Sequence, residues 1–144
     1  MLINLYLFSM IFQKEIVLEP KKRGFHLITN DVISQLPVST GIVNIFIKHT
    51  SASLTINENA DPSVRRDFET HFNKMVPETA TYFEHIYEGT DDMTSHIKSS
   101  LLGSTISFPI KNGIPQFGTW QGIYLCEHRN SGGKRKIFLT VIGN

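Results

Sequence analysis

The chain has 144 residues, which fits one domain, and its 40% hydrophobic and 19% charged residues are ordinary for a globular protein. A formal net charge of +1 provides no overall field that would favour nucleic acid or an acidic membrane, so we expect neither as a partner. The single cysteine, Cys126, excludes an intrachain disulfide and a CxxC motif, and a reducing cytoplasm is the expected location.

The start of the chain is apolar and uncharged as far as Phe12. This stretch is shorter than the ~20 residues that a membrane helix needs. It also lacks the basic residues that open a signal peptide, which is the less favoured alternative. We therefore expect residues 1–9 to be an N-terminal extension or an edge strand, and residues 10–144 to form a single domain.

Alternating apolar residues predict strands in the first part of the chain. The strongest pattern lies at 41–49, where Val43 and Ile47 belong to the apolar series. A short helix capped by Asn30 or Asp31 is expected before it. The other strands of this part are expected at 11–18, 25–28 and 53–57.

Two longer helices follow. Asp61 is a favourable N-cap and Pro62 suits the first helical position, where its missing N–H costs nothing. A stripe at helical spacing predicts the core face of this helix: Val64, Phe68, Phe72 and Met75. The next helix is expected at about 92–102, with Gly103 as its stop. Its apolar residues also recur at helical spacing: Met93, Ile97 and Leu101.

The remainder of the chain predicts only strands, at 104–110, 114–118, 121–127 and 135–142, with turns at Lys-Asn-Gly and Asn-Ser-Gly-Gly. The last strand is apolar on both faces, with Leu139 on one side and Phe138 and Ile142 on the other. A second layer or a neighbouring subunit should therefore cover each face. The expected fold is α+β, with mostly antiparallel sheet layers and two to three helices.

Three of the six histidines stand at the ends of predicted elements, where site residues gather. His49 ends the 41–49 strand, His85 precedes an acidic loop, and His96 lies one turn inside the third helix. Three imidazoles from separate segments can hold a divalent metal ion, zinc or magnesium, and leave a position open. Alternatively, His49 is a hydrogen-bonded core residue, and His85 and His96 are solvated.

Three carboxylates are candidates for catalysis. Asp91 and Asp92 precede a helix, and because two adjacent caps are redundant, one is left for metal binding or general-base work. The alternative is that both only cap the helix. Glu127 continues the inward alternation of the 121–127 strand, so its charge requires a partner, for which Arg129 or Arg135 is expected.

Candidate substrate-binding residues lie in two other segments. Trp120 stands between two glycines beside Gln121, and together they can line a pocket for a flat ring or form a packing corner. Leu102-Gly103-Ser104, together with Lys98, weakly resembles a small oxyanion-binding cradle. The chain contains no Gly-x-Ser-x-Gly motif, Cys/His dyad or Rossmann glycine pattern, which disfavours hydrolases and dinucleotide enzymes of those types.

Three blocks in order resemble the YjbQ family. The first is His49-Thr50-Ser51-Ala52-Ser53-Leu54 with Asn57 to Pro62. The second runs from Tyr87-Glu88-Gly89 through Asp91-Asp92 and Ser95-His96-Ile97-Lys98 to Leu102-Gly103-Ser104. The third is Gly118-Thr119-Trp120-Gln121-Gly122-Ile123 with Glu127-His128-Arg129. The resemblance extends from about Met10 to Gly143.

The resemblance implies a homotrimer and a secondary thiamine-phosphate synthase activity, which joins a pyrimidine pyrophosphate to a thiazole phosphate and releases pyrophosphate. It implies a small phosphorylated metabolite as ligand, with His49, His85 and His96 as motif histidines. We expect Lys98 and Arg135 to take phosphate oxygens and Trp120 to stack on the pyrimidine. The alternatives are a metal-dependent hydrolase and a non-catalytic trimeric binding protein for a small anion.

Overall fold

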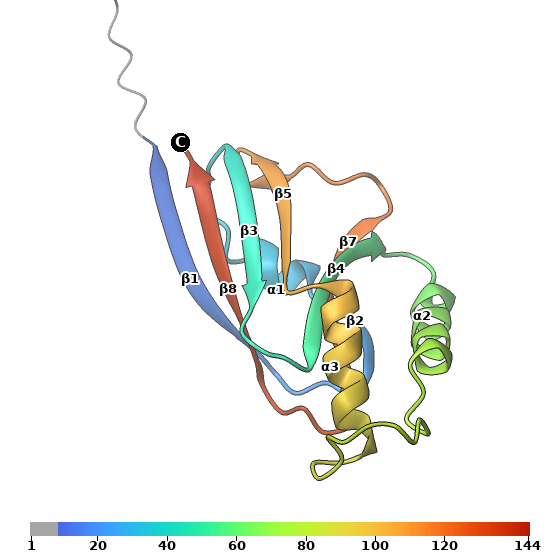
Figure 1. The fold of residues 1–144 in the computed structure, drawn as a ribbon. Helices are drawn as coiled ribbons and strands as arrows, with labels where there is room; N and C mark the ends of the chain where they lie inside the picture. The colour runs from blue at the N-terminus through green and yellow to red at the C-terminus, as the bar shows by residue number, and fades with distance from the viewer. Residues whose placement is uncertain (1–8) are drawn as a thin grey trace, which may run out of the picture.

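Two antiparallel sheets lie face to face in the computed structural model, which describes residues 9–144 (Figure 1). The larger sheet has the strand order β1-β8-β3-β5-β6 and the smaller β2-β7-β4. The strands of the larger sheet are β1 (Met10–Leu18), β3 (Gly41–Ile47), β5 (Thr105–Lys111), β6 (Ile114–Pro115) and β8 (Arg135–Gly143). Those of the smaller are β2 (Gly24–Leu27), β4 (Ala52–Glu58) and β7 (Gln121–Glu127). The expected α+β class with antiparallel sheets is confirmed.

The main core fills the space between the two sheets. Val43, Ile45 and Ile47 point inward from β3 and are 0–1% exposed. They pair in register with apolar residues of β8, for example Ile45 with Leu139. The smaller sheet contributes Leu125 from its central strand. Each such side chain contributes about 1.5–3 kcal/mol by leaving water, so the alternation along β3 fixes which face of the strand is inside.

Helix α2 (Pro62–Met75) covers the other face of the smaller sheet. The predicted cap is confirmed, because the side chain of Asp61 accepts a hydrogen bond of 2.8 Å from the Ser63 N–H. The rings of Phe68 and Phe72 stack on Phe25 of β2, at centroid distances of 5.1 and 5.8 Å. The middle of the predicted apolar stripe, Phe68 and Phe72, therefore packs against β2. The last member of the stripe, Met75, is half exposed.

The short helix α1 (Thr29–Ile33) begins earlier than expected. Neither Asn30 nor Asp31 caps it, and its N-cap position, Ile28, has no side-chain hydrogen bond. Instead, the hydroxyl of Thr29 accepts a 2.9 Å bond from the Ile123 N–H of β7. This contact ties the start of α1 to the sheet and replaces the predicted cap.

Helix α3 (Thr90–Leu102) turns a polar face toward the protein. Its buried residues are Asp91, Asp92, Thr94, Ser95, Lys98 and Ser99. Leu101, from the apolar series that predicted this helix, is 60% exposed. The helix packs on β4, and the predicted stop at Gly103 is confirmed with φ +100°.

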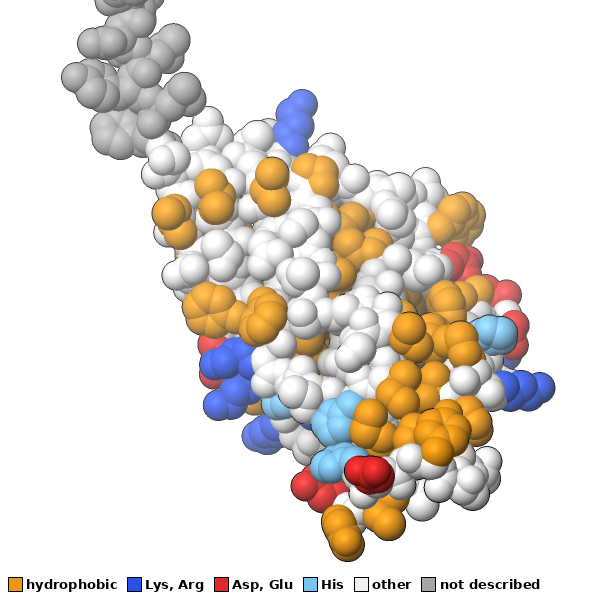
Figure 2. Space-filling view, viewed as in Figure 1, with side chains coloured by type: hydrophobic (Ala, Val, Ile, Leu, Met, Phe, Trp, Pro, Cys, Tyr) orange, Lys and Arg blue, Asp and Glu red, His pale blue; other side chains and the backbone are white. Residues whose placement is uncertain are grey.

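The outer face of the larger sheet carries exposed hydrophobic side chains. Ile42 of β3, Ile142 of β8 and Ile11 of β1 occupy adjacent register positions and are 56–69% exposed. Phe46 pairs with Phe138 further along and is half exposed. Hydrophobic side chains spread over the region of this sheet in Figure 2. The inner face of β8 is thus covered as expected, while its outer face has no second layer within residues 9–144.

None of the helices formed by residues 9–144 has the length and apolar character needed to cross a membrane.

Candidate metal centre

Two histidines and an aspartate converge at the start of α3. His85 lies in the 76–89 segment between α2 and α3, Asp92 in the first turn of α3, and His96 one turn later on the same face. One ligand atom from each lies within 4.8 Å of the other two. His85 Nε2 is 2.7 Å from Asp92 Oδ2, and His96 Nε2 is 3.5 Å from Asp92 Oδ1. We call these three residues the His–Asp–His cluster. Figure 2 shows histidine side chains beside acidic and hydrophobic ones in this lower part of the molecule.

The tautomer of His96 is fixed by a backbone contact. His96 Nδ1 lies 2.9 Å from the Thr50 carbonyl oxygen. Since a carbonyl can only accept, Nδ1 carries the hydrogen and donates it. A neutral His96 ring then presents the lone pair of Nε2 toward the oxygens of Asp92. His96 Nε2 lies 3.5 Å from Asp92 Oδ1, so one metal ion placed between them could bind both atoms. A hydrogen bond on the remote nitrogen is also how proteins orient metal-binding histidines.

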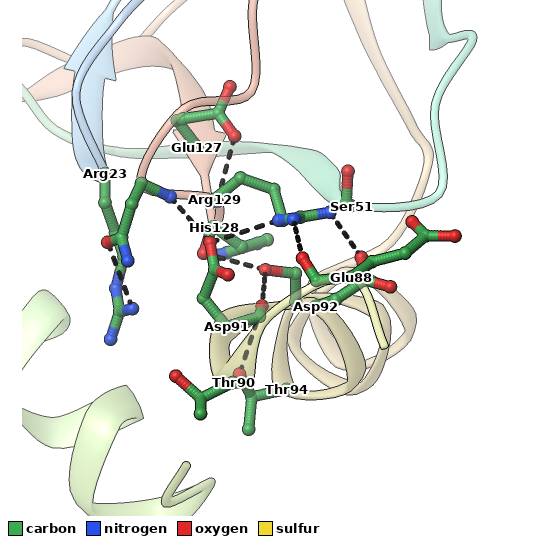
Figure 3. Close-up of polar contacts among 12 residues, drawn as sticks. Arg23, Ser51, Glu88, Thr90, Asp91, Asp92, Thr94, Glu127, His128 and Arg129 are labelled. Carbon is green, nitrogen blue, oxygen red and sulfur yellow. Dashed lines mark hydrogen bonds and ion pairs between the residues drawn. The ribbon is translucent and has the colours of Figure 1, made fainter. Parts of the chain in front are cut away.

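Arg129 holds the aspartates in place (Figure 3). Its Nε donates to Asp91 Oδ2 at 3.1 Å, its Nη1 to Asp92 Oδ1 at 2.5 Å, and its Nη2 to the Glu88 carbonyl at 2.9 Å. Asp91 Oδ2 also accepts the Asn130 N–H at 2.8 Å. Burial alone would raise the pKa of Asp91, but the Asn130 and Arg129 contacts outweigh it, and the pKa lies below its usual value.

The two aspartates therefore divide their roles. Both aspartates accept a hydrogen bond from Arg129, but Asp91 also accepts the Asn130 backbone N–H, whereas Asp92 also faces the two histidines. The predicted helix cap is absent from both, because the N-cap position is Gly89 with no side-chain hydrogen bond. The idea that one of the pair is left for chemistry points to Asp92.

The other polar residues of α3 explain why this face is buried. Ser95 Oγ donates to the His128 carbonyl at 2.7 Å, and Ser99 Oγ donates to the Ala52 carbonyl at 3.0 Å. His128 directly follows β7 and Ala52 begins β4, so the hydroxyls tie α3 to the smaller sheet. The burial of each polar group is compensated by its partner.

Lys98 faces α2, away from the His–Asp–His cluster. It is 2% exposed, its ammonium group donates to Asn73 Oδ1 at 2.6 Å, and burial lowers its pKa. In this position Lys98 links α3 to α2. The predicted contact of Lys98 with a phosphate stays a prediction.

Glu127 and Arg135 form a buried ion pair. Glu127 is 0% exposed, and Arg135 donates to it through Nε at 2.7 Å and Nη2 at 2.5 Å. The partner expected for Glu127 is thus found in Arg135, while Arg129 contributes only its backbone N–H, at 3.0 Å. The pair lies outside the His–Asp–His cluster, and Glu127 has no free access to solvent.

His49 lies beside this ion pair and is not part of the cluster. Its Nε2 accepts the Lys136 backbone N–H at 2.7 Å, and its Nδ1 is 3.4 Å from Arg135 Nη1. Burial, followed by the Arg135 charge, lowers the pKa of His49. A ring nitrogen that already accepts a backbone hydrogen has no lone pair for a metal. The structure therefore brings Asp92, and not His49, together with His85 and His96.

A hollow of about 410 Å³ adjoins the cluster through His96. It lies between the end of β3 and the C-terminal half of α3. Its walls are mostly hydroxyls, imidazoles and backbone, from His49, Thr50, His96, Ser99, Ser100, Gly103 and Ser104. Of the predicted substrate-binding residues, Ser104 is the one that lines this hollow.

Trp120 and Gln121 lie at the opposite end of β7 from Glu127. The seven residues of this strand span roughly 20 Å. Trp120 is 62% exposed, so residues 9–144 enclose it neither as a pocket for a flat ring nor as a packed corner. Gln121 Oε1 accepts the Gly118 N–H at 2.8 Å, which closes the turn before β7.

Sequence reasoning missed the contribution of three groups to this site. The sequence indicates Arg129 only as a partner of Glu127, the Thr50 carbonyl carries no side-chain signal, and the sequence pattern leaves the role of His128 open. His128 is 2% exposed and its Nε2 lies 2.8 Å from Ser53 Oγ. Burial lowers the pKa of His128 to about 3, so it is neutral and structural. The run Glu127-His128-Arg129 was the only available signal.

Comparisons with known proteins identify a family that matches most of this chain. The family described as "UPF0047 protein YjbQ-like" matches residues 14–144. The chain is 55% identical over 138 residues to the UPF0047 protein YjbQ of Salmonella typhimurium, with 93% of this chain and 99% of the relative covered. It is 51% identical over 138 residues to the protein of the same name in Escherichia coli O157:H7, with the same coverage.

Solved structures share the fold. A conserved hypothetical protein from Thermus thermophilus matches with a TM-score of 0.82 and 28% identity, covering 89% of this chain and 98% of that one. A YbjQ-like protein of unknown function from Sulfolobus solfataricus matches with a TM-score of 0.83 at 22% identity, covering 94% and 99%, and this likeness concerns the fold alone.

Proposed function

The chain belongs to the UPF0047 protein YjbQ-like family, and we propose that it is a divalent-metal-dependent enzyme centred on His85, Asp92 and His96. The observation that carries this proposal is the lone pair of His96 Nε2. The Thr50 carbonyl orients the ring so that Nε2 faces Asp92, and the ligand atoms of His85, Asp92 and His96 all lie within 4.8 Å of one another.

The donor set fits a zinc-like ion better than magnesium. Two imidazoles and one carboxylate are common ligands of zinc and similar transition ions, whereas magnesium prefers oxygen ligands and retains several waters. A bound ion of this kind polarises a substrate oxygen or lowers the pKa of a bound water to about 7. The chain supplies the rest: Arg129 fixes the Asp92 carboxylate, and the half-exposed side chain of His85 leaves one side open to solvent.

Hydrolysis is the reaction class that this site supports best. The hollow beside His96 offers hydroxyls and imidazoles to a substrate, and none of its lining residues carries a lysine or arginine charge. A pyrophosphate leaving group, by contrast, needs cationic donors as negative charge develops on its oxygens.

Thiamine-phosphate synthase-type transfer is the second candidate, and one contact favours it. Arg135 Nη1 lies 3.4 Å from His49 Nδ1, so a guanidinium stands just behind the wall of the hollow. Trp120 would have to come from a neighbouring copy to stack on a substrate there, because it lies at the far end of β7 in its own chain.

We also propose that the outer face of the larger sheet binds further copies of the chain, as in the homotrimer that the family resemblance implies. The row of Ile11, Ile142 and Ile42 is apolar and uncovered, which is typical of an interface. A cytoplasmic location fits the single thiol, Cys126, which is fully buried and whose pKa burial raises to about 12.

Elemental analysis of protein purified without chelators tests the proposal. We expect close to one equivalent of zinc or a similar ion per chain, lost in Asp92→Asn and His96→Ala and kept in His71→Ala. His71 is an exposed histidine of α2 and serves as the matched control. Equal metal content in all four proteins, or no metal in any of them after zinc is supplied, would refute it.

A parallel assay separates the two reaction classes. Metal-loaded protein is offered a panel of esters and amides, or the pyrimidine pyrophosphate together with the thiazole phosphate. Metal-dependent hydrolysis that His96→Ala abolishes supports the first class. Thiamine phosphate formation that is lost in both His96→Ala and Trp120→Ala supports the second.

A further inference from the structure

A second pocket, lined by several basic side chains, lies apart from the His–Asp–His cluster. It has a volume of about 400 Å³ and is formed by β2 and the first half of α2. Three arginines line it, Arg23, Arg65 and Arg66, together with His26 and one carboxylate, Glu69. None of these residues belongs to the His–Asp–His cluster or lines the hollow beside it.

The positive charge of this pocket is not balanced by its own residues. Arg23 is paired, with Nε 3.1 Å from Glu69 Oε1 and Nη1 in contact with Glu78. Glu69 is therefore already engaged. Arg65 and Arg66 have no ion-pair partner among residues 9–144. The three guanidiniums thus meet two carboxylates, Glu69 in the pocket and Glu78 outside it, and both of these pair with Arg23, in a protein whose overall net charge is only +1.

Arg65 carries an unmet hydrogen-bond donor. Its Nε atom is buried and has no partner within the described part of the chain. A buried donor left without an acceptor is costly, and native proteins retain few of them unless a ligand, water or ion supplies the acceptor. This second observation points to an acceptor that enters the pocket from outside.

The remaining walls suit a small ligand. The strand order places β2 at an edge of the smaller sheet, so one side of its backbone has no partner strand among residues 9–144. Phe25, 5% exposed and stacked on Phe68, forms an apolar floor. Thr70 adds a hydroxyl. The volume lies at the lower end of the range for small-molecule pockets, which is about 300–1,000 Å³.

We propose that this pocket binds a small phosphate-bearing anion, with Arg65 and Arg66 as its principal ligands. Planar guanidinium groups hold phosphate oxygens through paired, charge-assisted hydrogen bonds, which an exposed lysine does not reproduce. The charge is confined to one pocket and does not form a stripe. This favours a free or terminal phosphate over a nucleic-acid backbone.

Calorimetric titration with pyrophosphate and with inorganic phosphate tests this inference. Chelator is present throughout, and the ionic strength is about 50 mM to limit screening. Wild-type protein and Asp92→Asn should bind alike, which separates this site from the metal centre. Arg66→Gln, at an exposed position, should weaken binding about tenfold, and the Arg65→Gln/Arg66→Gln pair should abolish it. Lys74→Gln, at the exposed far end of the same helix, is the charge-matched control and should bind within about twofold of wild type.

Four results would overturn the inference. One is the absence of saturable binding of either anion to wild-type protein. A second is equal affinity in the wild type and in Arg66→Gln, which tests the pocket even if changes at Arg65 disturb folding. Another is an equal loss in Lys74→Gln, which indicates non-specific attraction. The last is tighter binding of single-stranded oligonucleotides with increasing length, which indicates a nucleic-acid surface.

Discussion

His128 should make the stability of this protein depend on pH below neutrality. The ring is 2% exposed, and burial lowers its pKa from 6.5 to about 3. The folded protein thus binds a proton at His128 more weakly than the unfolded chain does. The stabilisation is therefore complete above pH 6.5 and declines as the pH falls toward 3. Below pH 6.5 the loss approaches about 1.4 kcal/mol per pH unit, or about 2 kcal/mol between pH 8 and pH 5.

His128→Gln isolates this effect. A glutamine amide can replace the ring nitrogen that lies 2.8 Å from Ser53 Oγ, but it does not titrate. Urea unfolding of both proteins at about pH 8 and about pH 5, at one protein concentration, gives the difference in free energy of unfolding. The wild type should lose about 2 kcal/mol more than the variant. An equal loss in both proteins would show that His128 is not held neutral by burial.

Three further changes test the scaffold. Glu127→Gln leaves the buried charge of Arg135 unpaired and should lower the free energy of unfolding by about 3–5 kcal/mol in denaturant melts, while bound metal stays unchanged. In Gly132→Ala the new Cβ would lie 2.5 Å from Arg135 Nη2 and from Glu127 Oε1. This variant should therefore lose more stability than Gly133→Ala, where only the positive φ of +73° opposes alanine, at a cost of about 1–2 kcal/mol. The reverse order of stability in thermal melts would contradict this. Phe46→Asp places a charge on the outer sheet face and should convert the proposed trimer to monomers in light scattering, whereas an unchanged mass would remove this face from the interface.

Much of the fold could be predicted because its signals are local. The alternation of Val43, Ile45 and Ile47 predicts β3, and Asp61-Pro62 predicts the start of α2, since each pattern depends only on neighbouring residues. The orientation of α3 could not be predicted. Its hydroxyls are buried because they donate to carbonyls at the ends of distant strands, so Leu101 remains outside.

The candidate site follows the same division. His96 and Asp92 are four residues apart on one helix, and His85 lies in the segment just before that helix. The proximity of the three residues therefore has a local cause. The position of His49 depends on the register between β3 and β8, which brings the Lys136 N–H to its ring. Trp120 directly precedes β7, at the end of the strand opposite Glu127, and a sequence block does not show which end of a strand adjoins the site.

The zinc-edge X-ray absorption spectrum of the zinc-loaded protein tests the metal centre most directly. The account predicts two imidazole nitrogens and one carboxylate oxygen at about 2.0–2.2 Å from the ion, with one imidazole lost in His96→Ala and none lost in His71→Ala. A shell of oxygen ligands alone, or a spectrum that His96→Ala leaves unchanged, would show that His85, Asp92 and His96 do not hold the metal.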